Sequence, residues 1–548
     1  MAIVDPAPRP SPFRPPRRAI ILLILGLYLT LRGYHSRDGD QAYRLPLLLH
    51  RQDPALFADD PFVRAFDAFN PHRGYLALLD VASRPLGLSA GIFALFVTTF
   101  AATCLGLDRL ARATWPERGP DVGLVAIGLA LTAKAGNIGT NHLFEAMLLD
   151  RLIGFALGWL ALAWAVERPA THGTRAAVAI GLAALVHPSI GLQLAMVLGA
   201  SWTAWALLAR ASGVAGRRAF FGLVALGLAL VPGVALQMGQ GGRLFQGLPA
   251  EEFRLLSVEL QNPQHMLPHL WRLPQWLAFG CYPILALLAL GRSGREGPEP
   301  RPAARTRLAI LLAVNLAGVG LAWLAVEVLH DLRVTVFQPF RMATLFRGLA
   351  LVAVSGRVVG LWRDGRLVDR SRALLVAVGL AGDWMLVVAT ANDLGVAAVE
   401  AARARGLVRS GPWLTKGVFG MVLTAGLTFL ARHDTESGQG PLIAALGALV
   451  VVSWVVKGRA PGWNRRRLAW ALGVAWAVPL AALVAGNVPD PTRPWAAALV
   501  NRCRFAAVPT DDVERLAVWC RAHTPAGARF IGPPGPKTFR LWSQRSLA

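Results

Sequence analysis

The stretch AIILLILGLYLTLRGYHSRDGDQAYRLPLLLHRQDPALFADD, residues 19–60, decides how the fold of this chain is interpreted. Its first part, residues 19–34, is an apolar run close to the ~20 residues that a helix needs to cross a bilayer. An acidic segment follows at once, and its aspartates are Asp38, Asp40, Asp53, Asp59 and Asp60. The stretch therefore predicts a first membrane span that leads directly into an acidic loop.

Apolar runs of this kind recur along the chain. Of the 548 residues, 54% are hydrophobic and only 16% are charged, a composition typical of proteins with many membrane spans. The runs are residues 19–34, 88–107, 122–135, 148–166, 176–187, 190–208, 219–238, 276–290, 308–329, 342–362, 373–391, 414–431, 442–456 and 468–486. We therefore expect an all-α polytopic membrane protein with roughly 13–15 transmembrane helices.

The formal net charge of +24 indicates orientation rather than a nucleic-acid partner. Lys and Arg lie in short loops between the apolar runs instead of forming one basic stripe, as in proteins that obey the positive-inside rule. Basic loops also attract anionic lipid head groups. We expect membrane lipids as partners and no nucleic acid.

The charge pattern also divides the chain. Residues 1–17 are Pro-rich and basic, which predicts a disordered cytoplasmic tail. Residues 18–486 form the membrane domain, with residues 35–74 as a long first extracytoplasmic loop. The first run resembles a signal sequence in length, but no small-x-small cleavage site follows it, so we expect an uncleaved span. Residues 487–548 form a C-terminal tail.

With the N-terminus in the cytoplasm, five basic loops along the first ten spans fall on the cytoplasmic side. After Arg372, a single span would place the next basic segments outside. One extra crossing returns these segments to the cytoplasmic side, either with Asp383 at a tight turn or with residues 392–402 as a short second limb. An odd number of spans then places the C-terminus outside the cytoplasm. The tail itself predicts a helix over 511–523 and a strand over 529–531. These elements are too few for a core of their own, so the tail packs on the membrane domain or begins an α/β domain that this chain does not complete.

Candidate site residues lie in the segments predicted on the outer side. No GxGxxG, Walker A, HExxH, CxxC pair or GxSxG motif is present, so soluble-enzyme chemistry and ATP hydrolysis have no support. Carboxylates at a membrane mouth serve as general bases, and Arg and His hold phosphate groups. The candidates are Asp38, Asp40, Tyr43, His142, Glu145, His187, His265, His269, Arg272 and Arg341.

Several of these residues also fit a structural role. Asp59 and Asp60 precede Pro61, as in a helix cap or turn. Asp38 and Asp40 fit a solvated loop, and Glu145 can pair with Lys134 or Arg151. His187 lies in the Pro-broken segment Val186-His187-Pro188-Ser189, either as a cavity residue or in a tight turn between two spans. His265 and His269 have the i, i+4 spacing of helical metal ligands, but Pro268 between them argues against a regular helix.

The arrangement resembles the C-type fold of membrane glycosyltransferases, which take sugars from polyprenyl-phosphate donors. RDGDQAYRLPLLL after the first span occupies the place of that superfamily's first extracytoplasmic loop, with Asp38 or Asp40 as the matching acid. The segments GTNHLFEAMLLDRLIGFAL, LVHPSIGLQLA, NPQHMLPHLW, QPFRMATLFRG and HTPAGARFIGPP also resemble a group of uncharacterised bacterial multi-pass proteins with this plan.

The resemblance implies sugar transfer from a polyprenyl-phosphate carrier to an acceptor hydroxyl group outside the cytoplasmic (inner) membrane. Asp40, or as second choice Asp38, would deprotonate the acceptor. The residues implied to hold the lipid phosphate are Arg341, His265, His269 and Arg272, and those implied to line the cavity are His187, His142, Glu145 and Tyr43. No organic cofactor is expected, and a divalent metal stays open. The alternatives are a transporter or lipid flippase, or a non-catalytic protein of envelope assembly.

Overall fold

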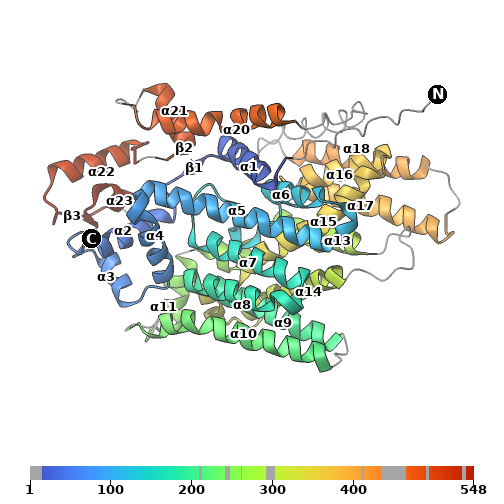
Figure 1. Cartoon of the computed structure of the whole chain (residues 1–548), viewed down its shortest axis with the longest axis horizontal. Coiled ribbons are helices and arrows are strands. Elements are labelled where there is room, and N and C mark those ends of the chain that lie inside the picture. The colour runs from blue at the N-terminus through green and yellow to red at the C-terminus, as the bar shows by residue number, and fades with distance from the viewer. Residues whose placement is uncertain are drawn as a thin grey trace, which may run out of the picture.

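The computed structural model describes residues 15–208, 213–240, 247–260, 262–291, 303–408, 413–433, 464–488, 493–505, 507–532 and 538–547 (Figure 1). These residues are almost entirely helical, with four strands of two residues each. Eight helices among them are long and apolar enough to cross a membrane. The expected all-α architecture with membrane-length helices is confirmed at this level.

The helices follow one another in the order in which the apolar runs predict them. The first half contains α1 (Arg17–Arg32), α2 (Gln41–Gln52), α3 (Pro61–Ala68), α4 (Arg73–Leu86), α5 (Leu88–Thr114), η1 (Pro116–Arg118), α6 (Asp121–Thr132), η2 (Ile138–Thr140), α7 (Asp150–Glu167), α8 (Pro169–Val186), α9 (Pro188–Leu208) and α10 (Gly213–Met238). The second half contains α11 (Ala250–Phe253), η3 (Arg254–Glu259), α12 (Pro263–Met266), η4 (Pro268–Leu270), α13 (Leu273–Leu290), α14 (Ala303–Trp323), η5 (Leu324–Val328), η6 (Leu332–Phe337), η7 (Pro339–Arg341), α15 (Met342–Arg363), α16 (Leu367–Gly379), α17 (Asp383–Ala404), α18 (Trp413–His433), α20 (Arg465–Ala485), α21 (Pro494–Arg502), α22 (Asp512–His523) and α23 (Phe539–Ser543).

One expected span is wrong as a single helix. Residues 373–391 divide between α16 and α17, which meet in a turn after Gly379. Asp383 begins α17, and its Oδ1 accepts a hydrogen bond from the Gly136 backbone N–H at 2.8 Å. The structure therefore has the tight turn predicted at Asp383, while the extra membrane crossing stays a prediction. The expected run at 442–456 lies outside the described residues.

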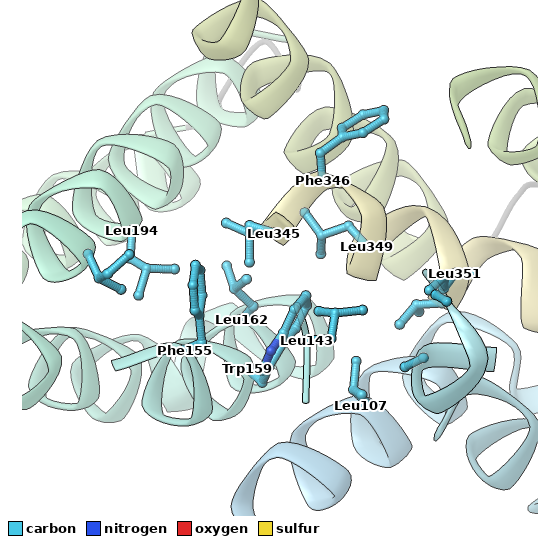
Figure 2. Packing of buried hydrophobic residues seen from close by; sticks show 14 of the residues in the cluster. Leu107, Leu143, Phe155, Trp159, Leu162, Leu194, Leu345, Phe346, Leu349 and Leu351 are labelled. Carbon is cyan, nitrogen blue, oxygen red and sulfur yellow. The ribbon is translucent and has the colours of Figure 1, made fainter. Parts of the chain in front are cut away.

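The core centres on α15, in which every residue from Met342 to Gly356 is buried. Trp159 of α7 lies between α5 and α15, because a Cβ at Gly106 or Gly348 would come within 2.6 or 2.3 Å of its side chain. Figure 2 shows Trp159 beside Leu143 and Leu162, with Leu345 of α15 facing them. Small residues at these positions allow close helix packing, as is common between membrane helices.

Helix α1 packs against α20, the last membrane-length helix of the described chain. Gly26 of α1 faces Trp476 of α20, whose indole N–H donates to the Leu22 carbonyl at 3.0 Å. Directly after α1, strand β1 (Tyr34–His35) pairs in parallel with β2 (Cys503–Arg504), which follows α21. This strand pair places the start of the C-terminal tail beside the first loop.

The tail packs on that loop, as one of the two sequence-based alternatives predicts. Figure 1 shows α22 and α23 gathered with α2, α3 and α4 at one end of the helical bundle. Strand β3 (Arg529–Phe530) pairs in parallel with β4 (Ser546–Leu547). Asp60 caps α3 through Oδ1, confirming its predicted role as a helix cap, while its Oδ2 accepts from Arg540 at 2.7 Å.

Candidate functional site

A cavity of about 430 Å³ lies where the first loop meets the ends of the membrane-length helices. One part of its wall is charged or polar and the other is apolar. The charged and histidine side chains are Asp40, Arg44, His72, Asp150, Arg151, His187 and Arg341. The apolar part includes Phe69, Leu192, Leu230, Val234, Met238, Val336 and Phe337. The cavity is thus amphipathic, with three arginines and two aspartates in its polar wall.

Residues at or beside the first turns of five helices contribute to this wall. They belong to the starts of α2, α4, α7, α9 and α15. A helix N-terminus carries a partial positive charge and unpaired backbone N–H groups, which favour anions. Together with the three arginines, this arrangement suits a phosphate-bearing ligand.

Asp40 reaches the cavity because its side chain is not used to cap α2. Its Oδ2 instead accepts a hydrogen bond from Arg151 Nη1 at 2.7 Å. Glu145 holds the same guanidinium at 2.9 Å through Nη2. Burial raises the pKa of Asp40, but the charge of Arg151, its hydrogen bond and the charge of Arg44 outweigh this and place the pKa below its ordinary value. Asp40 is therefore ionised near neutral pH.

His72, at the start of α4, forms a second charged contact. Its Nδ1 lies 2.5 Å from Asp150 Oδ2, at the start of α7, and Arg44 approaches the same carboxylate at 3.8 Å. Burial lowers the pKa of His72, the Asp150 charge opposes this, and the Arg44 charge adds to the lowering. The pKa stays below its ordinary value, so the imidazole is neutral near pH 7.

His187 lies between α8 and α9, where Pro188 ends one helix and starts the next. Arg341 Nη1 donates to His187 Nε2 at 2.7 Å. Because a guanidinium only donates, Nε2 is the acceptor in this contact, while Nδ1 lies 3.3 Å from Ser189 Oγ and 3.4 Å from the Ile190 backbone N–H. The His187 ring meets that of His72 edge-on, with centroids 5.9 Å apart. The junction is thus a turn between helices and a cavity wall at once.

The apolar wall opens toward the outside of the helical bundle. Leu192 of α9 is 38% exposed, and Val234 and Met238 of α10 are 51% and 80% exposed. Both helices are long and apolar enough to cross a membrane. A ligand with a long hydrocarbon chain can therefore place its head group among the arginines and its chain along this wall.

Three of the predicted site residues, Asp40, His187 and Arg341, line this cavity. Glu145 is one contact away, through Arg151. His265 lies behind the wall, where its Nδ1 bonds the Gly139 carbonyl at 2.7 Å. Burial lowers the pKa of His265, against the effect of that hydrogen bond, and the nearby charge of Arg341 lowers it further.

Three other predicted site residues do not line the cavity. Asp38 accepts a hydrogen bond from the next residue, Gly39, at 2.6 Å in the turn before α2. Tyr43 points toward α3, where its ring packs on Phe62 with centroids 5.8 Å apart. His142 is exposed, with Nε2 3.4 Å from the Asn137 side chain. Adjacent helix positions are rotated by about 100° about the axis, so Tyr43 faces α3 while Arg44 faces the cavity.

His269 and Arg272 also lie outside the cavity wall. Pro268 separates α12 from η4, so His265 and His269 do not share a helix face. The exposed His269 contacts Glu327 at 3.1 Å, and Arg272 is an exposed residue before α13. The structure places neither residue in this cavity wall, and their role in holding a lipid phosphate stays a prediction. Within the described ranges, no group of three or more His, Cys, Asp or Glu side chains is arranged to hold a metal ion.

Sequence reasoning did not name His72, and it counted Arg44, Asp150 and Arg151 among the ionisable outer-side residues without giving them a role. Arg44 follows Asp40 by one helical turn, a spacing that places both on one face. Asp150 and Arg151 open an apolar run, where charges mark a span end. His72 follows Pro71 directly before a helix. Each signal is local, whereas the site forms by contacts between segments more than 25 residues apart.

Comparison with known families adds one match. Residues 511–548 match a domain of unknown function (DUF6798). Comparison with curated proteins and with solved structures found no significant match. The matched segment comprises α22, β3, α23 and β4, the tail elements that pack on the first loop through Asp60 and Arg540.

Proposed function

We infer that this protein is a membrane glycosyltransferase-like enzyme that transfers a sugar from a polyprenyl-phosphate donor to an acceptor on the extracytoplasmic side. One observation carries the proposal: a single cavity joins a carboxylate, three arginines and several helix N-termini to an apolar wall that opens outward. An isoprenoid chain fits the wall, and a phosphate fits the polar end.

The roles follow from position. Arg341 and Arg44 would bind the phosphate, and Arg151 would hold Asp40 toward the acceptor hydroxyl group. The acceptor oxygen displaces the phosphate at the anomeric carbon, so the lipid phosphate leaves with the electron pair of the broken C–O bond. Arginine charges favour the negative charge that develops on this leaving group. The proton of the acceptor must pass to a base at the same end.

The test is reconstitution of the full chain in lipid vesicles with a panel of polyprenyl-phosphate sugars. We expect turnover with at least one donor, loss in Asp40→Asn and retention in Asp53→Asn. Asp53 is a matched control, because it lies in the same loop and only supports a turn at Ala55. Absence of turnover with every donor would contradict the proposal.

The proposal also requires that the loops around the cavity share one side of the membrane. Cysteines placed at positions 40 and 268 of a cysteine-free variant should react with an impermeant reagent added outside. The four native cysteines, which are free and buried, are replaced by alanine or serine first. Labelling of either position only from the cytoplasm would remove the shared extracytoplasmic site.

The lateral opening also suits a lipid flippase, since Leu192 and Val234 are exposed beside charged groups. A flippase moves polyprenyl-phosphate sugar across the bilayer without breaking its glycosidic bond. The same vesicles distinguish the two functions when a labelled donor is followed both for transfer to the acceptor and for movement between leaflets.

A further inference from the structure

Two side chains in the polar wall are candidate proton acceptors, and their surroundings differ. Asp40 is held by a direct hydrogen bond from Arg151. A carboxylate that accepts from a guanidinium gains little by taking a proton, because the ion pair is lost. Asp40 is therefore well placed to align the acceptor hydroxyl group, but it is a poor acceptor for the proton of that group.

The second candidate is His72, whose contacts resemble those of a catalytic base with an orienting acid. Nδ1 lies 2.5 Å from Asp150 Oδ2, and both atoms are buried. A carboxylate at one ring nitrogen fixes the proton there and leaves the other nitrogen with a free lone pair. The ring itself lines the cavity.

Burial is the main reason that the pKa of His72 lies below its ordinary value. Asp150 of α7 opposes this by favouring the imidazolium form, while Arg44 of α2 and Arg341 of η7 add to the lowering. Another titratable neighbour is His187, between α8 and α9, whose Nε2 already accepts from Arg341. A neutral imidazole is the form required of a base.

Resting on the proposed glycosyl transfer, we propose that His72, oriented by Asp150, is the catalytic base that accepts the proton of the acceptor hydroxyl. In this step the acceptor O–H bond breaks, its proton moves to His72 Nε2, and the oxygen bonds the anomeric carbon. The lipid phosphate departs with the electrons of the broken bond. The imidazolium then returns its proton to water, and Asp150 stabilises the charge in between.

The experiment measures transfer rates of the reconstituted full chain between pH 4 and 8 for wild type, His72→Gln, His72→Ala and Asp150→Asn. Wild type should lose activity on acidification through a pKa below 6.5, the ordinary histidine value. His72→Gln should lose roughly 10²- to 10⁴-fold in kcat, as for a missing general base. Added imidazole should restore part of the activity of His72→Ala.

His50→Gln is the matched control, because His50 is another histidine of the first loop and bonds the Leu56 carbonyl outside this cavity. It should keep the wild-type rate and pH profile. Binding of polyprenyl phosphate without sugar to His72→Gln should match wild type, which shows an intact site.

Three results would overturn the assignment. If His72→Gln stays within threefold of wild type while Asp40→Asn is inactive, Asp40 is the base. If His72→Gln loses polyprenyl-phosphate binding together with turnover, His72 is a ligand of the phosphate. Lack of turnover by wild type with every donor overturns the proposed function and this assignment together, whereas the first two results leave the proposed function standing.

Discussion

Asp60 accepts a hydrogen bond from Arg540 at 2.7 Å, although 480 positions separate them in the chain. The carboxylate is fully buried, and it also accepts from the backbone N–H groups of Phe62, Val63 and Leu547. One side chain thus starts α3 and holds the end of the C-terminal tail.

Loss of this contact should release the tail. Arg540→Ala leaves a buried carboxylate with one charged partner fewer, which costs about 3–5 kcal/mol for a broken buried ion pair. We expect a lower apparent melting temperature in detergent and faster proteolysis after α21. The matched control is Arg529→Ala, which removes the exposed partner of Asp59 and should leave both measurements unchanged. Equal effects of the two substitutions would contradict the special role of Asp60.

The two aspartates nearest the membrane boundary should differ in activity. Asp40 lines the cavity, whereas Asp38 accepts a hydrogen bond from its neighbour in a turn. Under the proposed function, Asp40→Asn should lower the transfer rate roughly 10²-fold by misplacing the acceptor hydroxyl group, and Asp38→Asn should lower it less than threefold. Assays with one active donor decide this. A larger effect at Asp38 would transfer the catalytic role to the residue in the turn.

The contact between Arg151 and Asp40 predicts a pH dependence of stability. The pKa of Asp40 in the folded protein lies below its ordinary value, so its ionised form contributes stability above about pH 4 and loses it as the pH falls. Arg151→Met removes the favourable charge and leaves burial, which raises the pKa. The variant should therefore lose less stability than wild type on acidification from pH 4 to pH 3.

Apparent melting temperatures between pH 3 and pH 7 measure this difference. Arg151→Met also affects Glu145, so the same pair is compared in an Asp40→Asn background. There the difference in acid sensitivity should disappear. If it persists, it belongs to Glu145 and the prediction fails.

Arg341 should determine the affinity for a lipid phosphate. Its guanidinium lines the cavity beside His187. Arg341→Met should weaken binding of polyprenyl phosphate roughly 10- to 150-fold, the effect of one hydrogen bond to a charged group. Arg333→Met is the control, because Arg333 is 85% exposed and pairs with Asp331. Calorimetry in lipid nanodiscs measures both, and equal affinity for Arg341→Met and wild type would remove Arg341 from the phosphate site.

The core predicts a steric effect of one methyl group. A Cβ at Gly348 would lie 2.3 Å from the Trp159 ring, so Gly348→Ala should destabilise the protein by about 1–3 kcal/mol through overpacking. Gly318→Ala is the matched control, since Gly318 is also helical and a Cβ there meets no atom within 4 Å. Thermal unfolding should show a loss only for Gly348→Ala.

The sequence predicts most of the long apolar helices but not the short helices α2 and α3 of the first loop, and it predicts the site only in part. Runs of apolar residues predict helices because a bilayer-length helix is a local property of about 20 residues. Pro61 after Asp60 predicts a cap, and the structure has that cap. The second role of Asp60 depends on Arg540, which no local pattern relates to the first loop.

The site residues also divide into those that a local sequence pattern predicts and those that depend on long-range contacts. Asp40, His187 and Arg341 were found because they are charged or polar groups at predicted helix ends. The sequence does not point to His72, because packing rather than spacing places Asp150 beside it. His269 lies outside the cavity wall and contacts Glu327, a neighbour 58 positions away that no local pattern predicts.

The Asp60–Arg540 contact also sets an order of events during synthesis. At about 5–20 residues per second, the ribosome needs roughly 24–96 s to proceed from one partner to the other. Throughout that time the carboxylate of Asp60, which belongs to the same loop as Asp40, lacks its arginine partner. The tail can therefore pack on the first loop only after the helices between them have been made, and a chain released before Arg540 would leave the Asp60 carboxylate without this partner.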